Sequence, residues 1–395
     1  MPRVLRILNR LAVGGPVLNA TLLTRYMAPE FDTMLVVGEK ESHEKSAAYL
    51  ADNLGIQYVT VKGMGRAISP APDYLAYREL KKLIRSYKPD IVHTHAAKPG
   101  VLGRLAASAC KVPVIVHTFH GHVFHSYFNS TRTKFFINTE RYLAKKSSAI
   151  VAISDTQRDE LVRQYKIASF EKFRVVPLGF DLDRFRTGQQ EKREQFRKEF
   201  NLQEEIAIGI IGRLVPVKNH YLFMKGIAHV LQNSTKKIRA FIIGDGETRA
   251  DLEQVAGQVG ISFTTEKDGH HDQPLVFTSW RSDVDVINAG LDIVCLTSFN
   301  EGTPVSLIEA QASSKPVVST RVGGIGDIML EGKTGLLSDI ADTELFCNNL
   351  LSLVEDDSLR SELGNNSREF VAEKFSYQRL VKDMSALYND LLNKT

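Results

Sequence analysis

Short runs of Val, Ile and Leu alternate with longer segments of helical hydrophobic spacing along the whole chain. In the first half the apolar runs predict strands at 3–8, 33–37, 57–60, 91–94, 114–118, 149–153 and 174–176. The segments between them predict helices at 17–27, 42–54, 73–87 and 103–109. Strands that alternate with helices in this way indicate a parallel sheet covered on both faces.

The alternation stops at Pro177–Asp181 and restarts after a charged segment, 189–201, which predicts a surface helix. Further strands are expected at 206–211, 240–243, 276–277, 293–296 and 316–319, and further helices at 345–355, 359–374 and 377–392. A chain of 395 residues is too long for one ordinary domain. We therefore expect an α/β protein with two doubly wound, Rossmann-like domains that face each other across a cleft, where ligands meet the carboxyl ends of the strands.

The predicted domains are residues 1–180 and 181–375, followed by a C-terminal helix, 376–395, that packs back on the first domain. A hydrophobic content of 43% and a charged content of 24% are those of a soluble globular protein. The N-terminus alternates Arg with apolar residues, as a first strand does and a secretory signal does not. The three cysteines, Cys110, Cys295 and Cys347, are far apart, which fits a reduced cytoplasmic location better than a disulfide or zinc framework.

Charge is distributed unevenly along the chain. Residues 1–180 carry 26 Lys and Arg against 14 Asp and Glu, a net charge of +12, and the remainder carries −8. This asymmetry suggests that the first half meets an anionic surface or ligand, although a chance surface distribution explains it equally well.

Aromatic and basic residues are interleaved most densely between Phe124 and Lys146. The cations of this segment are Arg132, Lys134, Arg141, Lys145 and Lys146, and only Glu140 opposes them. Such a composition favours an anionic membrane surface, while an ordinary amphipathic helix with its aromatic residues in the core remains an equal alternative. Nucleic acid is disfavoured, because no nucleic-acid motif is present.

Two carboxylates eight positions apart, Glu301 and Glu309, follow the strand expected at 293–296. Gly302, Thr303, Pro304 and Val305 lie between them and predict a tight loop that leads into a helix. Backbone N–H groups at a helix start attract phosphate, and adjacent carboxylates accept hydrogen bonds from hydroxyl groups. A sugar attached to a nucleoside diphosphate offers both groups.

Two cations, Arg213 and Lys218, lie five positions apart in the loop after strand 206–211. Both can turn toward one diphosphate, although two solvated surface cations would look the same in sequence. Gly14 and Gly15 after the first strand permit a close backbone approach to a ligand, but a plain turn is the favoured interpretation, since no dinucleotide motif is present.

Two further motifs follow predicted strands. Asp245, between Gly244 and Gly246, is expected to cap a helix after a tight turn. Trp280 and Arg281 follow the strand at 276–277 and are candidates to border a flat nucleobase.

A histidine-rich run extends from His117 to His125. Its irregular spacing and the lack of a nearby Cys or paired carboxylate make a substrate role more probable than a metal site. His120, at a strand end, is the candidate to reach the cleft, and the others are expected to be structural or on the surface.

Taken together, these motifs resemble the retaining glycosyltransferases of family 4, which have the GT-B fold. The most specific part is the spacing of Glu301 and Glu309, supported by the run 212–219 and by 277–283, where Ser279 replaces the Gly that is commoner in the family. The run 119–122 and the stretch from Lys98 to Arg104 are most similar to members that assemble bacterial polysaccharides and O-antigens.

The resemblance implies a role for each motif. Arg213 and Lys218 would neutralise the leaving diphosphate, Glu309 would hold the ribose and Glu301 the donor sugar, with backbone amides of Gly302 to Val305 completing the phosphate site. His120 would contact the donor sugar, and Gly14 and Gly15 would border the phosphate and the acceptor. Trp280 and Arg281 would lie next to the nucleobase. Lys98 and Arg104 would lie on the acceptor side. No metal and no cofactor are implied.

The resemblance further implies transfer of a hexose or N-acetylhexosamine, with retention, from a nucleotide sugar, most simply a UDP-sugar, to a saccharide acceptor. A lipid-linked acceptor in exopolysaccharide or O-antigen synthesis would place the protein in the cytoplasm, peripheral on the inner face of the plasma membrane. Two alternatives remain open at this point, namely a nucleotide-sugar epimerase or related isomerase on the same fold and a catalytically idle binding protein.

Overall fold

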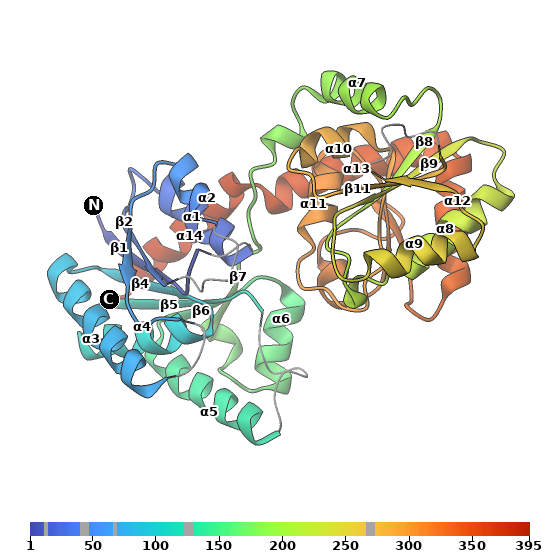
Figure 1. Ribbon diagram of the computed structural model, residues 1–395. Coiled ribbons are helices and arrows are strands. Elements are labelled where there is room, and N and C mark those ends of the chain that lie inside the picture. The colour runs from blue at the N-terminus through green and yellow to red at the C-terminus, as the bar shows by residue number, and fades with distance from the viewer. Residues whose placement is uncertain (12–14, 40–46, 66–68, 122–129, 266–272) are drawn as a thin grey trace. The chain divides into compact units, whose positions relative to one another are not determined.

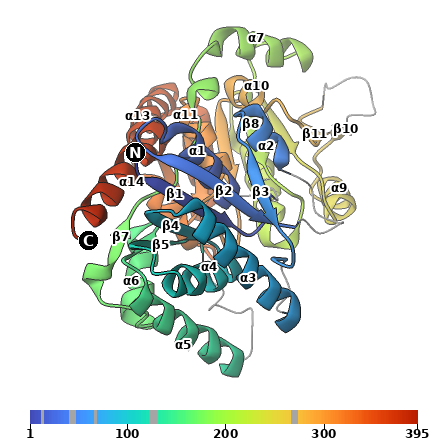
Figure 2. The same ribbon diagram turned by 90° about the vertical axis from the view of Figure 1, so that its left-hand side faces the viewer.

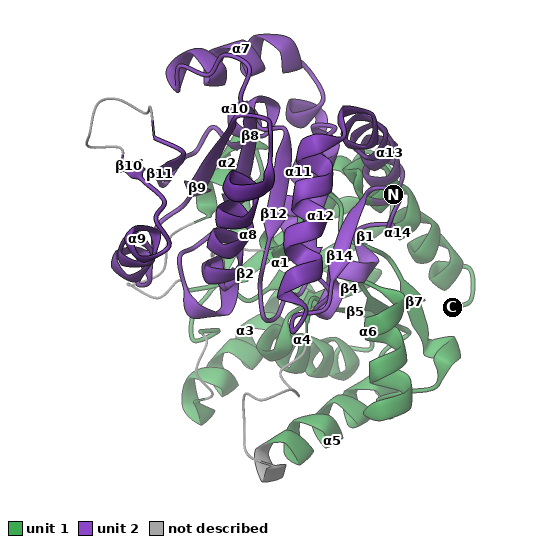
Figure 3. Cartoon of the chain, turned by 90° about the vertical axis from the view of Figure 1, so that its right-hand side faces the viewer, with its two compact units in different colours: residues 1–180, 375–395 green, residues 181–374 purple. Residues whose placement is uncertain are grey.

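The computed structural model describes residues 1–11, 15–39, 47–65, 69–121, 130–265 and 273–395, and for residues 130–132 the backbone alone (Figure 1). The chain divides into two compact units (Figure 3). Unit 1 contains residues 1–180 together with 375–395, and unit 2 contains residues 181–374. Each unit is built on its own parallel sheet, so the predicted α/β class with two Rossmann-like folds is confirmed.

Unit 1 contains a seven-stranded parallel sheet in the order β3-β2-β1-β4-β5-β6-β7. The strands are β1 Arg3–Leu8, β2 Asp32–Gly38, β3 Tyr58–Val61, β4 Ile91–His95, β5 Val114–Phe119, β6 Ala149–Ala152 and β7 Phe173–Val175. Every residue of β4, β5 and β6 is buried, as in the central strands of a sheet that is covered on both faces, and this includes the His and Thr residues of β4 and β5. The strand order reverses between β1 and β4.

Helices cover both faces of this sheet. They are α1 Gly15–Tyr26, α2 Ala48–Asn53, α3 Pro70–Tyr87, α4 Ala97–Ala109, α5 Ser130–Lys146, α6 Asp155–Asp159 and α14 Tyr377–Leu392. On one side α4 packs between α3 and α5, and α1 and α14 lie on the other side (Figures 1 and 2). Leu380, Met384 and Tyr388 of α14 are buried against Leu23 and Phe31, so the last helix of the chain belongs to unit 1.

Unit 2 contains a second seven-stranded parallel sheet, in the order β10-β11-β9-β8-β12-β13-β14. The strands are β8 Ile206–Ile211, β9 Ile238–Ile243, β10 Phe263–Thr265, β11 Leu275–Ser279, β12 Ile293–Leu296, β13 Val317–Thr320 and β14 Gly335–Ser338. The helices are α7 Gln189–Glu199, α8 His220–Asn233, α9 Arg249–Gln258, α10 Val284–Gly290, α11 Val305–Ala312, α12 Thr343–Glu355 and α13 Asp357–Phe375. Here the strand order reverses between β8 and β12.

Helix α4 and the turn at Asp245 differ from the sequence predictions. Helix α4 begins at Ala97 and includes Gly100 and Gly103, whereas the prediction began at residue 103. A Cβ on Gly103 would lie 2.6 Å from Cγ2 of Thr94, so glycine here allows α4 to pack closely on β4 and does not interrupt the helix. The predicted helix cap by Asp245 is wrong, because α9 begins at Arg249 and the Asp245 carboxylate accepts hydrogen bonds from the Gly246 amide and the Ser279 hydroxyl.

Candidate active site

The reversal of strand order in unit 2 brings two predicted motifs together. Strands β8 and β12 are neighbours in the sheet, with Ile208 beside Ile293 and Ile210 beside Cys295. The loop with Arg213 and Lys218 leaves β8 at its carboxyl end, and the loop with Glu301 leaves β12 at the same edge. In doubly wound folds this point of the sheet is where ligands bind.

Lys218 and Glu301 form an ion pair that joins the two loops. The Lys218 Nζ lies 2.5 Å from Oε1 of Glu301, and the Ser298 hydroxyl donates to the same oxygen at 2.6 Å. The side chains are 21% and 10% exposed, so the pair is largely shielded from solvent. Ser298 is a partner that the sequence analysis did not single out.

Backbone contacts fix the relative position of these loops. The Phe299 amide donates to the Val217 carbonyl at 2.8 Å, and the Thr297 hydroxyl donates to the Lys218 carbonyl at 3.0 Å. Asn219 adopts a left-handed conformation with φ +48°, which turns the chain from the short helical turn Pro216–Lys218 into α8. The positions of Lys218 and Glu301 are therefore set by main-chain geometry as well as by their own charges.

A glycine pair after β13 packs against the Glu301 loop. A Cβ on Gly323, where φ is +48°, would lie 1.9 Å from the Glu301 carbonyl oxygen, and one on Gly324 would lie 2.0 Å from the Gly302 carbonyl oxygen. The Gly324 amide donates to the Glu301 carbonyl at 3.1 Å. Only glycine permits this close support of the loop.

Arg213 lies in the same loop as Lys218, five positions before it, and is exposed. No hydrogen bond or ion pair joins its side chain to other residues in the part of the chain that the structure describes. Its guanidinium is therefore accessible to a ligand, and such a planar fork suits the oxygens of a diphosphate.

Helix α11 begins directly after the Glu301 loop. Pro304 precedes its first residue, and the backbone N–H groups of its first turn have no partner within the helix, as at every helix start. Space is open next to Gly302, since a Cβ there would meet nothing within 4 Å. The loop and the start of α11 together form an accessible site that favours anions.

Glu309 lies one turn further along α11, where its side chain is 18% exposed. Burial raises the pKa of this carboxyl to about 7, against the opposing effect of Arg184, whose guanidinium lies 3.6 Å away. The nearby Asp285 of α10 also raises this pKa. Arg184 is a residue that the sequence analysis missed, because 125 positions separate it from Glu309 and no local pattern marks it.

Trp280 and Arg281 follow β11, and their surroundings differ. The Trp280 side chain is 53% exposed. Arg281 forms ion pairs with Glu199 of α7 and Asp283, and its Nε donates to Asp283 at 2.8 Å. These partners raise the pKa of Arg281 and fix its side chain as an anchor of the loop, which leaves Trp280 as the better candidate for contact with a base.

In unit 1, His120 follows β5 and contacts His95 at the end of β4. The Nε2 of His120 lies 2.9 Å from Nδ1 of His95, and the two rings stack. Burial lowers the pKa of His120 to about 3, so the ring is neutral at physiological pH. His95 was not predicted, although it lies next to His120 because β4 and β5 are neighbours.

The remaining predicted residues of unit 1 have different environments. Gly15 begins α1, whereas Gly14 lies outside the described residues, as do His122 and His125. Lys98 forms an ion pair of 2.5 Å with Asp73 of α3. Arg104 is fully buried, donates to the Gly100 carbonyl and pairs with Glu140 at 2.7 Å. Its position suits a structural role, so we do not include Arg104 in the proposed acceptor site.

The basic and aromatic segment forms helix α5 from Ser130 onward, and Phe124 lies outside the described residues. Phe135 and Tyr142 are 65% and 54% exposed, whereas Phe136 is partly buried against the core. Lys134 and Lys145 are exposed, but Arg141 donates to the carbonyls of Tyr165 and Lys166. The Arg132 side chain is not described. Among the described residues, no helix is both long and apolar enough to cross a membrane.

Comparisons with known proteins agree with this architecture. Residues 13–184 match the family model Glycosyltransferase Family 4, and residues 191–370 match Glycosyl transferases group 1. The chain is 28% identical to the Escherichia coli UDP-Gal:alpha-D-GlcNAc-diphosphoundecaprenol alpha-1,3-galactosyltransferase, over 87% of this chain and 86% of the relative. It is 24% identical to the Staphylococcus aureus capsular polysaccharide biosynthesis glycosyltransferase CapM, over 84% and 85% of the two chains.

Solved structures show the same fold. Anabaena Alr3699/HepE in complex with UDP superposes with a TM-score of 0.80 at 18% identity, covering 98% of this chain and 100% of that one. The GT-B architecture predicted from the motifs is therefore confirmed. With a Glycosyltransferase Family 4 model matching its first part and a Glycosyl transferases group 1 model matching its second, the chain belongs to the glycosyltransferases.

Proposed function

We propose that this glycosyltransferase moves a hexose or N-acetylhexosamine, with retention of configuration, from a UDP-sugar to a lipid-linked saccharide in exopolysaccharide or O-antigen synthesis. Unit 2 holds the nucleotide sugar and unit 1 the acceptor. The observation that carries the proposal is the ion pair between Lys218 and Glu301 at the β8–β12 switch point, beside an accessible Arg213 and the start of α11. These groups together match a diphosphate and the hydroxyls of a sugar.

Breaking the bond between sugar and phosphate separates charge, and the proposed site stabilises the charges that develop. Negative charge develops on the diphosphate as the sugar leaves, where Arg213, Lys218 and the amides of Gly302 to Val305 stabilise it. Glu301 accepts hydrogen bonds from the hydroxyls of the departing sugar, and Glu309 accepts those of the ribose. Arg213 and Lys218 supply the positive charge that a metal ion would otherwise provide, so the proposed reaction needs no metal.

His120 contributes from unit 1 as a neutral ring. Its Nε2 is held by His95, and the low pKa keeps the imidazole uncharged while positive charge develops on the sugar. A neutral ring can exchange a hydrogen bond with a sugar hydroxyl, whereas a charged ring would repel the developing cation. We propose Gly15, with Gly14, as the backbone that borders the phosphate and the acceptor, and Lys98 as an acceptor-side cation.

The donor and acceptor classes are supported by three observations. The name of the Escherichia coli relative includes UDP-Gal and GlcNAc-diphosphoundecaprenol as its substrates, and the Anabaena structure was obtained with UDP. Residues 1–180 carry a net charge of +12, which suits an acceptor that bears phosphate groups.

The proposal is tested by incubating the purified chain with UDP-Glc, UDP-Gal, UDP-GlcNAc or UDP-GalNAc and a synthetic GlcNAc-diphosphate lipid. We expect an acceptor that is heavier by one sugar and has an α-anomeric linkage by NMR, and an unchanged rate in EDTA. Epimerised UDP-sugar without acceptor would support the isomerase alternative. Neither transfer nor donor hydrolysis with any nucleotide sugar would contradict the proposal, and a rate abolished by EDTA would contradict its metal-independent part.

The lipid-linked acceptor places the enzyme at the inner face of the plasma membrane, where the cations of α5 meet anionic headgroups. Replacing Arg132, Lys134, Lys145 and Lys146 together with Gln is expected to weaken binding to anionic vesicles by more than tenfold, because each cation near such a surface contributes about 1 kcal/mol. Arg141 is left unchanged, since carbonyl groups hold it. Vesicle flotation measures the effect, and equal binding of the variant and wild type would contradict the proposed contact.

A further inference from the structure

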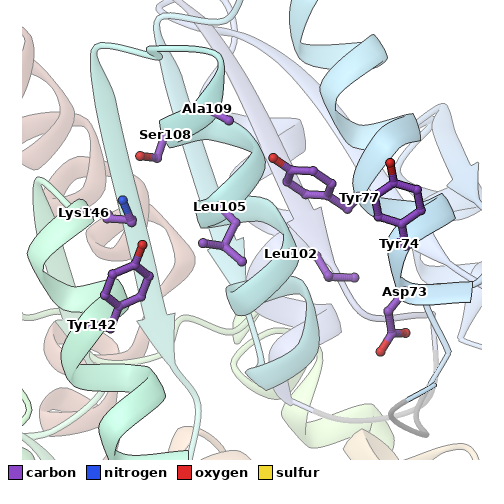
Figure 4. A pocket seen from close by; sticks show the side chains of 9 residues that line it. All are labelled: Asp73, Tyr74, Tyr77, Leu102, Leu105, Ser108, Ala109, Tyr142 and Lys146. Atoms are coloured by element: carbon purple, nitrogen blue, oxygen red, sulfur yellow. The ribbon is translucent and has the colours of Figure 1, made fainter. Parts of the chain in front are cut away.

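A groove runs along the outer surface of α4, between α3 and α5 (Figure 4). Its volume is about 410 Å³. Leu102 and Leu105 of α4 line its base, Tyr74 and Tyr77 line it from α3, and Tyr142 and Lys146 line it from α5. All three helices belong to unit 1, and none of these residues is part of the proposed reaction site.

The rims of the groove combine aromatic rings with cations. Lys146 Nζ lies 4.9 Å from the centre of the Tyr142 ring, and Lys81 Nζ lies 5.3 Å from that of Tyr77. Tyr74 and Tyr142 are 60% and 54% exposed. Tyrosine, with an apolar ring and a polar hydroxyl, suits the boundary between headgroups and acyl chains.

The charge on this surface is strongly positive. Helix α3 contributes four cations, Arg78, Lys81, Lys82 and Arg85. They follow Tyr74 at intervals of three or four residues, which places them along the same face of the helix. Asp73, the acid that lines the groove, is neutralised by Lys98, and the nearby Glu140 is neutralised by buried Arg104. Glu79 is the other acid of α3. A ligand for this surface therefore carries negative charge beside an apolar part.

We propose that this groove binds an anionic phospholipid of the bilayer, with its phosphate at Lys146 and Tyr142 and the upper part of an acyl chain over Leu102 and Leu105. A second copy of the chain that presented the same surface would bring like charge and is disfavoured. The inference rests on the proposed membrane location but not on the transfer reaction. It extends the membrane contact from α5 to α3 and α4 and gives it a defined site.

The test uses the single Trp of the chain, Trp280 in unit 2. In a Trp280→Phe background, Tyr142→Trp places an indole at the groove, and Tyr49→Trp places one on α2, where Tyr49 is 52% exposed. Vesicles of phosphatidylcholine with brominated phosphatidylglycerol, at saturating UDP, are expected to quench the indole of Tyr142→Trp and to leave that of Tyr49→Trp unquenched. Phosphatidylcholine alone, brominated or not, is expected to quench neither.

A matched pair of variants isolates the charge in the groove. Ala109, an exposed lining residue at the end of α4, is replaced with Glu or with Gln, two side chains of nearly equal size. Ala109→Glu is expected to weaken binding to the phosphatidylglycerol vesicles about fivefold, and Ala109→Gln to leave it close to that of the wild type. Both variants are expected to transfer sugar normally to a short-chain, water-soluble acceptor, which separates this site from the reaction.

Three results would overturn the inference. These are equal quenching of the indoles of Tyr142→Trp and Tyr49→Trp, equal binding of the Ala109→Glu and Ala109→Gln variants, and equal binding to vesicles with and without phosphatidylglycerol. Displacement of the vesicles by a soluble acidic peptide at micromolar concentration would instead identify the groove as a protein-docking site. Loss of sugar transfer with retained lipid binding would count against the proposed function and leave the groove assignment intact.

Discussion

Replacing Lys218 with Met is expected to lower kcat for sugar transfer by about a hundredfold to a thousandfold, while the chain stays folded. Lys218 lies 2.5 Å from Glu301 at the β8–β12 switch point, where the departing diphosphate is proposed to bind. A fixed cation there stabilises negative charge that grows in the transition state, so its loss affects kcat more than donor affinity. Steady-state release of UDP at saturating donor and acceptor measures the change.

Two controls separate catalysis from the loss of an ion pair. Lys225→Met removes an exposed cation from α8, the helix that follows Lys218, and we expect this variant to keep kcat within twofold of the wild type. The thermal unfolding midpoint of Lys218→Met is the second control, and we expect it to stay close to that of the wild type. A kcat of Lys218→Met near that of the wild type would remove Lys218 from the mechanism.

The affinity for UDP is expected to rise with pH across neutrality and to level off above pH 7, with up to a tenfold change per pH unit on the acid side. Burial raises the pKa of Glu309 to about 7. Below that pH the carboxyl is mostly protonated, and it must lose its proton before it accepts hydrogen bonds from both ribose hydroxyls. Isothermal titration calorimetry with UDP between pH 5.5 and 8.5 measures the dependence, which arises because Glu309 must release a proton when UDP binds.

The charged groups around Glu309 allow this pH effect to be assigned. Arg184 lowers the pKa of Glu309, whereas Asp285 of α10 raises it and is itself paired with Lys192 of α7 at 2.9 Å. Arg184→Gln is therefore expected to move the pH dependence of UDP binding to higher pH. Arg186, two positions away, is also exposed, and Arg186→Gln is expected to leave the pH dependence unchanged.

Glu309→Gln provides the reference for this experiment, because UDP also titrates near pH 6 through its terminal phosphate. The variant is expected to bind UDP more weakly and to retain only the pH dependence of the ligand. Parallel curves for wild type and Glu309→Gln would show that Glu309 does not take part. By the same assignment, Glu309→Ala is expected mainly to weaken donor binding and Glu301→Ala mainly to slow transfer, and the reverse result would mean that the two roles are exchanged.

The strands of both sheets were largely predictable because a buried parallel strand needs a continuous apolar run. Residues 206–211 and 293–296 show this directly, and β8 and β12 occupy those positions. The outer strands β10 and β14 were missed, since Phe263–Thr265 has one apolar residue and Gly335–Ser338 has only two, whereas β12 is apolar throughout. Local sequence also misjudged Gly100, which lies inside α4 where an added Cβ would meet the His117 ring of β5 at 2.6 Å, whereas the predicted helix began at Gly103.

For the candidate site, motif spacing pointed to Glu301, Glu309, Arg213 and Lys218 but not to the contacts among them. The ion pair of Lys218 with Glu301 joins residues 83 positions apart, and it depends on β8 and β12 being neighbours in the sheet. Arg281 shows the converse case, because a motif placed it near the base whereas the structure pairs it with Glu199 and Asp283. Charge alone does not tell a ligand-binding arginine from one that stabilises the fold.

The sequence by itself determined the α/β class and the loops that carry the candidate residues, because apolar periodicity and glycine or proline placement act over short distances. Only the tertiary structure decided which of those loops meet, that Arg184 faces Glu309 and that His95 holds His120. It also revealed the groove over α4, which three helices separated along the chain form together. Sheet order and helix packing bring distant residues into contact, and a pattern along the chain does not contain that information.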